Sequence, residues 1–246
     1  MSPRADLSFP PLMAGLPLSG AQDPFERACA QAALGCDAGL VAYNLGADTL
    51  RAALVLAPEV PLRAAMAMLP TCGVGFQNAL GALAPPEVAV HLEWGGAIRV
   101  NGASCGRLRA AASSADPEAV PDWLVIGLEV SWMPPDPEAP GATPDATGLI
   151  AEGCAELDPG HLLESWARHT LVWINRIEDV DASGRAALHT DWRALAHGLG
   201  EEIVQPWRGE ALSGTFLGVD EDFGMLLRQG TETRLLPLTG LLEENT

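Results

Sequence analysis

Apolar and polar residues alternate most clearly between Val88 and Val130, where the pattern predicts four strands that pair in one sheet. These expected strands are Val88–Glu93, Ala97–Val100, Ser104–Ala112 and Trp123–Val130. Asn101-Gly102 is a strong hairpin signal, because both central residues of that turn need positive φ. Trp123–Val130 is almost continuously apolar, which indicates a strand buried on both faces. We expect these strands to form the centre of the sheet.

The remaining pattern before residue 200 predicts helices that pack on this sheet. Asp23 followed by Pro24 is a normal helix start, and Pro70 should interrupt a longer helical stretch. The expected helices are Phe25–Leu34, Leu62–Leu69, Val74–Leu83, Gly160–Ile177 and Ala186–Leu199, and two further strands are expected at Gly39–Tyr43 and Leu50–Ala57. Met133–Thr147 is rich in proline and acid and is expected to be a loop. The predicted fold class is α/β (α+β), a mixed β-sheet with packed helices.

From Glu201 the pattern changes to short strands separated by tight turns. The expected strands are Ile203–Pro206, Glu210–Val219, Met225–Arg228 and Thr233–Leu238. A module of this size buries too little surface to be stable without docking on its neighbour. We therefore expect two domains, residues 1–200 and a small C-terminal β domain, residues 201–246.

Charge excludes two classes of partner. The 246-residue chain carries a formal net charge of −18, whereas nucleic acids and anionic membranes require a basic surface. No apolar run is long enough to span a membrane, and the N-terminus does not resemble a signal peptide. All 14 basic residues are arginine, so no lysine is available for chemistry within the chain.

The cysteine pattern indicates a reducing compartment. The five cysteines are odd in number and scattered, and they form no C-x-x-C motif, so we expect neither a disulfide framework nor a zinc site. The histidines on the expected helices are eight residues apart, which is not metal-ligand spacing. Asp220-Glu221-Asp222 is expected to be a solvated turn rather than a calcium loop. These patterns predict a cytoplasmic protein without a bound metal.

Four segments, in this order, resemble the biotin/lipoate–protein ligase family. They are Asp37–Asn44, Leu92–Gly106, Leu124–Val130, and Leu188–Ile203 followed by Ser213–Leu227. The resemblance implies a mixed sheet with packed helices and a small C-terminal SH3-like β-barrel. It also implies a pocket on the sheet for biotin, lipoate or an octanoyl group, which ATP activates as an acyl-adenylate for transfer to a lysine of a carrier domain.

The resemblance also implies which residues touch the ligand. Tyr43 and Asn44 end the strand that contacts the acid, and the remaining positions belong to the family's Lys-Trp-Pro-Asn-Asp and Lys-x-x-Gly segments. The substrate-binding candidates are therefore Tyr43, Asn44, Trp94, Gly95, Gly96, Ser104 and Gly106.

Three departures from the family pattern bear on nucleotide chemistry. The Gly/Arg-rich loop is reduced to Leu45-Gly46-Ala47-Asp48-Thr49, Ala103 or Ser104 stands in the region of the lysine, and Glu129 aligns with the nucleotide-side asparagine. Phosphate oxygens are bound by amide donors and positive charge, which this loop does not supply. We therefore expect binding of a biotin-, lipoyl- or fatty-acyl-type ligand, or of its carrier domain, without the usual lysine-dependent adenylation.

An active enzyme with altered chemistry is the alternative. Arg107 and Arg109 lie two apart on a strand and hence on one face, where they either clamp a carboxylate or phosphate or are simply solvated or ion-paired. Cys105 is the candidate catalytic nucleophile if His91 or His189 activates it, and otherwise a small buried cysteine. A third interpretation is a regulatory partner of a true ligase. Monomer and homodimer both remain open.

Overall fold

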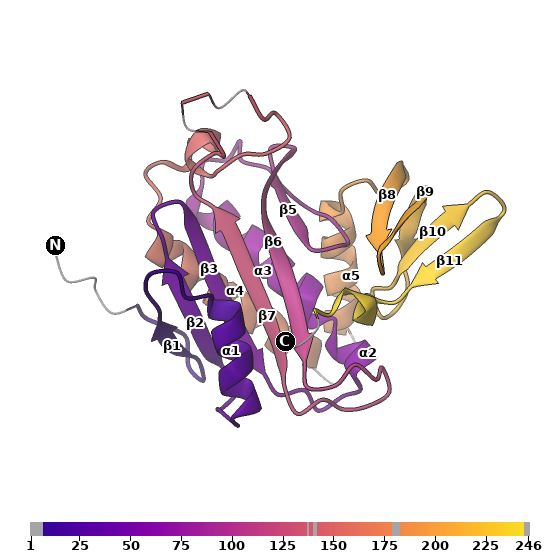
Figure 1. Ribbon diagram of the computed structural model, residues 1–246, viewed down its shortest axis with the longest axis horizontal. Helices are drawn as coiled ribbons and strands as arrows, with labels where there is room; N and C mark the ends of the chain where they lie inside the picture. The colour runs from indigo at the N-terminus through magenta and orange to yellow at the C-terminus, as the bar shows by residue number, and fades with distance from the viewer. Residues whose placement is uncertain (1–6, 137, 140–141, 179–182, 244–246) are drawn as a thin grey trace.

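The computed structural model describes residues 7–136, 138–139, 142–178 and 183–243. In this part of the chain, seven strands form one sheet in the order β1-β2-β3-β7-β6-β5-β4, and four strands form a second sheet in the order β11-β10-β9-β8 (Figure 1). The predicted fold class is confirmed: a mixed sheet with packed helices and a separate antiparallel C-terminal sheet. The domain boundary near residue 200 stays a prediction, as does the closure of the second sheet into a barrel.

The larger sheet is mixed because its first strand pairs in parallel while the others pair antiparallel. Its strands are β1 (Ala14–Pro17), β2 (Leu40–Leu45), β3 (Thr49–Leu56), β4 (Val90–Leu92), β5 (Ala97–Val100), β6 (Ala103–Ala112) and β7 (Leu124–Ser131). The Asn101-Gly102 hairpin is confirmed, with φ of 50° and 92° at its two residues. The expectation that the strands of residues 88–130 form the centre is wrong, because β3 pairs with β7 and leaves β4 at the edge.

Helices cover the two faces of this sheet unequally. On one face lie α3 (Met68–Leu83) and α4 (Pro159–Glu178), which pack against each other and enclose the main core. On the other face α1 (Pro24–Ala33) packs alone on β2, β3 and β7 through a small second core (Figure 1). Asp23 caps α1 by accepting a hydrogen bond from the Phe25 amide (3.0 Å). Beyond α1 this second face carries the partly exposed side chains of Arg51 and Glu129 and the exposed side chain of Arg107.

Two expected helix boundaries are wrong. The break before α3 follows α2 (Leu62–Ala65), so Pro70 lies in the first turn of α3, where its missing N–H costs no helical hydrogen bond. The last helix, α5 (Ser183–Leu195), ends before Leu199, and glycines with positive φ follow it. The structure adds two short helical segments, η1 (Ile150–Cys154) and η2 (Leu238–Leu241).

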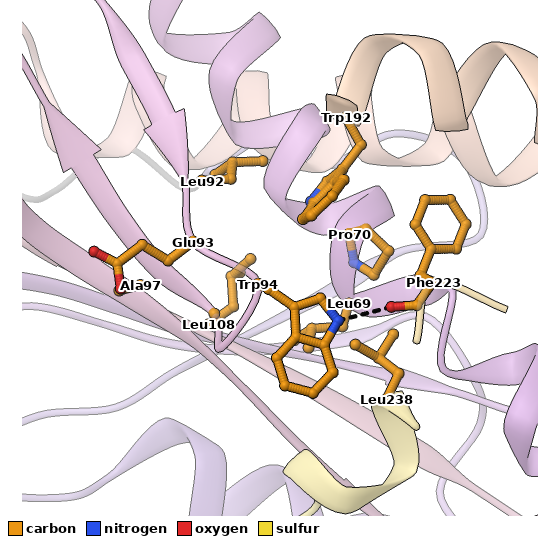
Figure 2. Close-up of a pocket in the computed structure, with 11 residues that line it drawn as sticks. Leu69, Pro70, Leu92, Glu93, Trp94, Ala97, Leu108, Trp192, Phe223 and Leu238 are labelled. Atoms are coloured by element: carbon orange, nitrogen blue, oxygen red, sulfur yellow. Dashed lines mark hydrogen bonds between the residues drawn. The ribbon is translucent and has the colours of Figure 1, made fainter. Parts of the chain in front are cut away.

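The second sheet docks on the first through the turn that joins two of its strands. Its strands are β8 (Glu202–Trp207), β9 (Glu210–Val219), β10 (Met225–Gln229) and β11 (Glu232–Leu236). Phe223, in the β9–β10 turn, is 1% exposed, and its ring stacks on His189 of α5 with centroids 3.9 Å apart. The Phe223 carbonyl accepts a hydrogen bond from the Trp94 indole (2.7 Å), which joins the two sheets (Figure 2).

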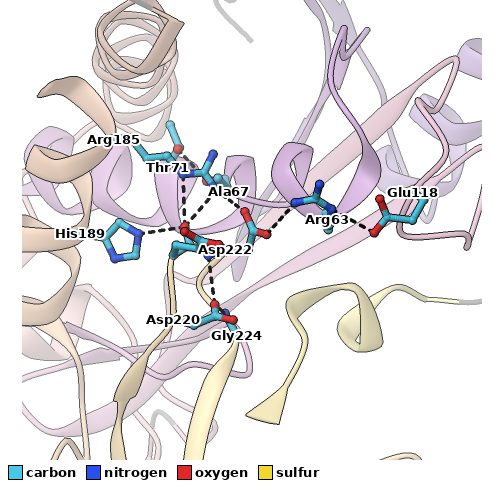
Figure 3. A network of polar contacts seen from close by, with 10 residues as sticks. Arg63, Ala67, Thr71, Glu118, Arg185, His189, Asp220, Asp222 and Gly224 are labelled. Atoms are coloured by element: carbon cyan, nitrogen blue, oxygen red, sulfur yellow. Dashed lines mark hydrogen bonds and ion pairs between the residues drawn. The ribbon is translucent and has the colours of Figure 1, made fainter. Parts of the chain in front are cut away.

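Ion pairs and hydrogen bonds also fix the same turn on the rest of the chain. Asp222 accepts from Arg185 of α5 (2.8 Å) and from Arg63 of α2 (3.3 Å), and His189 contacts the Glu221 carbonyl (3.1 Å) (Figure 3). Asp220 shapes the turn by accepting from the amides of Asp222 and Gly224. The acidic turn is thus a docking element and not the solvated turn that the sequence pattern suggested.

Phe223→Ala should loosen this docking. Removing a buried aromatic ring leaves a cavity, and we expect the free energy of unfolding to fall by about 3–5 kcal/mol. Urea denaturation followed by tryptophan fluorescence measures this change. Leu217→Ala, at a residue of β9 whose side chain is 40% exposed, is the matched control and should have little effect. Equal losses in both variants would contradict the docking role of Phe223.

Candidate functional site

A row of polar side chains crosses the open face of the larger sheet. In the strand register Asn44 pairs with Arg51, Arg51 pairs with Glu129, and Glu129 pairs with Arg107. Paired residues on neighbouring strands lie on the same face of a sheet, so these four residues form a continuous polar row. The small residues one pleat further along, such as Ala53 and Gly127, are covered by α1. This face is therefore accessible at Arg51, Glu129 and Arg107, whereas Asn44 at the end of the polar row is buried.

Opposite charges meet directly at one end of the polar row. Arg107 donates to the Glu129 carboxylate from Nη2 (3.1 Å) and from Nε (3.3 Å). The Arg107 side chain is 56% exposed and that of Glu129 35% exposed. An ion pair this exposed contributes little stability, so another carboxylate can compete with Glu129 for the guanidinium at small cost. The structure shows Arg107 ion-paired, which is one of the alternatives that the sequence left open.

Asn44 closes the other end of the polar row. It lies in β2 rather than in a loop, and it is 5% exposed. Its amide nitrogen donates to the carbonyls of Gly20 (3.0 Å) and Gln22 (3.3 Å), which precede α1. Asn44 thereby fixes the segment that leads into α1 against the sheet and forms one wall of the open face.

Arg109 lies on the same face as Arg107 but has a different environment. Its guanidinium binds Asp23 (Nη1–Oδ2, 3.0 Å) and Glu243 (Nη2–Oε2, 2.7 Å) and lies 4.2 Å over the ring of Phe25. The hydrogen bonds that Arg109 donates to these carboxylates, above all to Glu243, raise the pKa of Arg109 above its already high value. Arg109 is ion-paired with carboxylates of the chain itself, which is the ion-paired alternative that the sequence left open.

The connection from β2 to β3 is a tight hairpin where the family resemblance implies a phosphate-binding loop. Gly46–Asp48 makes the whole connection, and the Gly46 amide is engaged with the Thr49 carbonyl (3.0 Å). The Asp48 carbonyl accepts from the amides of Trp132 and Met133 and faces them. This hairpin presents a carboxylate and no guanidinium, so its residues do not fit a triphosphate.

The side chain of Trp94, in the turn Trp94-Gly95-Gly96, lies between the two sheets, where it contacts Phe223 and Trp207. Trp94 is 3% exposed, and the space beside it, bounded by Leu238 and Trp192 among others, has a volume of about 10 Å³, too small for a ligand (Figure 2). Gly96 has φ of 94°, and a Cβ there would lie 2.6 Å from the Leu108 carbonyl oxygen, which explains the glycine.

The remaining substrate-binding candidates are dispersed. Tyr43 pairs with Ala52 and so lies on the face opposite Asn44, where its ring contacts Phe9 (centroids 5.8 Å apart). Ser104 is engaged through its backbone with the segment that follows β7. Gly106 faces Val130 on β7, and a side chain there would collide with the neighbouring backbone. Of the candidates, the structure gathers only Asn44 and Arg107 in the polar row.

Cys105 lies in the core beneath the segment that contains η1. It is 1% exposed, and its thiol contacts the Ser131 carbonyl oxygen (3.6 Å). Burial, with smaller contributions from Glu152 and Cys154, raises the pKa of Cys105 to about 12. A thiol with this pKa is protonated at neutral pH and is a poor nucleophile. His189 is engaged with the β9–β10 turn, and the His91 ring lies 6.5 Å from that of His197.

Two members of the polar row were missed as ligand candidates from the sequence. Arg51 is a single charged residue within the apolar run of β3, and Glu129 holds the same position in β7. A lone charge in such a run is the signal that identifies an open patch on an otherwise buried strand. Their pairing depends on the strand order, which the sequence pattern did not predict.

Solved structures define the class of protein to which this fold belongs. The chain superposes on biotin protein ligase from Aquifex aeolicus in complex with biotin and ATP with a TM-score of 0.68 at 16% identity, covering 92% of this chain and 96% of that one. A biotin protein ligase-like protein of unknown function from Silicibacter sp. gives a TM-score of 0.88 at 61% identity, covering 97% of this chain and 100% of that one. The fold is that of the biotin protein ligases.

Sequence comparison places the chain within one family. Residues 9–194 match the model of the Biotin/lipoate A/B protein ligase family, to which this chain belongs. Residues 199–244 match a separate domain of unknown function (DUF4444). A biotin–[acetyl-CoA-carboxylase] ligase from Paracoccus denitrificans is 25% identical over 197 residues, which span 79% of this chain and 80% of the relative.

Two further observations concern the described residues. Within them, no group of three or more His, Cys, Asp or Glu side chains is arranged to hold a metal ion. None of the helices in this part of the chain has the length and apolarity needed to cross a membrane.

Cysteine reactivity tests the environment of Cys105. At pH 7.5 we expect iodoacetamide to modify the half-buried Cys36 while Cys105 stays unmodified in the folded protein, because burial keeps its thiol protonated. Peptide mass spectrometry, before and after unfolding in urea, measures both sites. Rapid modification of Cys105 in the folded chain would show an accessible thiolate instead.

Proposed function

We propose that this protein binds a small biotin-, lipoyl- or fatty-acyl-type ligand through its carboxylate on the polar row, without adenylating it by the lysine-dependent route. The observation that carries the proposal is the Arg107–Glu129 pair on an otherwise accessible sheet face. Arg107 offers a planar, bidentate donor to a carboxylate, and it gives up only an exposed ion pair when it does so.

The charges of the site support binding of a monocarboxylate more than of a nucleotide. The polar row contains Arg51 and Arg107 against Glu129, with the neutral amide of Asn44 at its end. One guanidinium in excess matches one carboxylate. A triphosphate needs several cations or amide donors, and the Gly46–Asp48 hairpin supplies a carboxylate instead. These residues do not fit ATP, so no step of the proposed function passes through it.

The alternative of an active enzyme has less support from the same geometry. A cysteine acyl-enzyme requires a thiolate, and burial raises the pKa of Cys105 to about 12. A ligase that uses Arg109 in place of lysine requires that guanidinium at the ligand, whereas Asp23 and Glu243 hold it. Arg107 is the candidate that retains an exposed guanidinium. We therefore favour a binding role in a reducing, cytoplasmic setting, with a biotinyl or lipoyl carrier domain as the macromolecular partner.

Arg107→Ala should weaken ligand binding. We expect the dissociation constant for octanoate, biotin or lipoate, whichever binds, to rise about tenfold, because a charged hydrogen bond to the carboxylate is lost at a partly exposed site. Isothermal titration calorimetry measures the constants. Arg234→Ala, on β11 of the second sheet, is the matched control and should leave them unchanged. Equal dissociation constants for the wild type and Arg107→Ala would show that the ligand does not bind at the polar row.

A labelling experiment separates binding from catalysis. When the protein is incubated with ATP, labelled biotin or lipoate and an apo-carrier domain, we expect no label on the carrier above the level without protein. The physical reason is the missing cationic cradle for the triphosphate and the absence of lysine from the chain. A catalytically active biotin protein ligase, run in parallel, is the positive control. Robust carrier labelling by this chain would establish an adenylating enzyme.

A further inference from the structure

The end of the described chain returns to the larger sheet, beside the polar row. After β11 the segment η2 buries Leu238, which is 4% exposed, against the sheet interface. The chain then pairs with β6: Leu242 forms a parallel bridge with Ala110, and the Glu243 amide donates to the Ala110 carbonyl (2.9 Å). We call Leu242–Glu243 the terminal strap. It covers the stretch of β6 that continues past its pairing with β5.

The terminal strap places a carboxylate on Arg109. Glu243 accepts from Nε of Arg109 (2.9 and 3.0 Å to its two oxygens) and from Nη2 (2.7 Å). This is the side-on bidentate arrangement in which arginine binds carboxylates most specifically. Glu243 therefore makes to Arg109 the contact that a carboxylate-bearing ligand would make.

The remainder of the Arg109 guanidinium is held independently of the strap. Nη1 donates to Asp23, the cap of α1, and the guanidinium plane is supported by the ring of Phe25. Removing Glu243 thus leaves the cation oriented and partly buried, with its Nε and Nη2 edge unoccupied. Such a cation is pre-organised to bind another carboxylate.

The position of Arg109 connects the strap to the polar row. Arg107 and Arg109 are two residues apart on β6 and so lie on one face, and the register places Arg109 opposite Gly127, one pleat from Glu129. The Glu243 side chain is 40% exposed, whereas that of Arg109 is 18% exposed. Glu243 is therefore the more exposed member of the pair.

We infer that Glu243 is an internal carboxylate that occupies Arg109, one pleat from the polar row, and so keeps this second guanidinium from sharing the ligand carboxylate that Arg107 binds. The inference rests on the proposed function and adds a way in which ligand binding is regulated. A tethered group competes at a high effective concentration, so the strap lowers the affinity for carboxylate ligands until it is displaced. When a ligand displaces Glu243, one carboxylate replaces another on the Arg109 guanidinium. The net charge around Arg109 therefore stays the same.

The experiment compares octanoate binding by the full chain, by Glu243→Gln, and by a chain that ends at Leu242. We expect both altered chains to bind octanoate about tenfold more tightly in calorimetry, because the competing charge is gone. Glu232→Gln, at an exposed residue of β11, is the matched control and should bind as the full chain does. Circular dichroism establishes that each chain is folded. The truncation provides a second variant should Glu243→Gln perturb the fold.

A chemical readout reports on Arg109 directly. Phenylglyoxal should modify Arg109 faster in Glu243→Gln than in the full chain, and octanoate should restore its protection, as peptide mapping will show. Unchanged octanoate affinity in both altered chains, with Arg107→Ala still weakening it, would overturn the strap inference and leave the proposed function standing. Faster modification that octanoate does not suppress would likewise overturn it. No octanoate, biotin or lipoate binding by any chain would overturn both.

Discussion

The pairing of β3 with β7 is the interaction on which both the core and the candidate site depend. These strands run antiparallel in register from Thr49 opposite Ser131 to Leu56 opposite Leu124. Their alternate residues fill the main core on one face and form the polar row and the α1 contact on the other. A slip of one residue between these strands would turn either Arg51 or Glu129 into the core, so burial of the apolar face fixes the register of the charged one.

Arg107 and Arg109 have different ion-pair partners because different segments of the chain lie over them. Arg107 and Arg109 share a strand and a face, yet the first extends beyond α1 and keeps one exposed partner, while the second lies at the N-terminus of α1 and gains two. Because the chain contains no lysine, guanidinium chemistry is what it offers to any anion. A planar bidentate donor suits a carboxylate, which supports the binding role that we propose.

The C-terminal sheet contacts the rest of the chain at several points, which include the Trp94–Trp207 ring contact and the two attachments that follow. Phe223 and Asp222 dock the β9–β10 turn on α5 and Trp94, and the strap brings Glu243 to Arg109. A module of this size gains much of its stability from such contacts rather than from its own core. The second attachment joins the end of the small domain to β6 beside the polar row.

The pattern of residues along the chain was enough to predict the local elements and the chemical groups that the chain has. Periodicity predicted most of the strands, the Asp23 cap and the Asn101-Gly102 hairpin, because those depend on residues close in the chain, and the order of segments indicated the family. Only the tertiary structure decided the strand order, the burial of Trp94 and Cys105, and the partners of Arg109. Each of these results from contacts between segments far apart in sequence, such as Arg109 with Glu243, and periodicity carries no information about which distant segments meet.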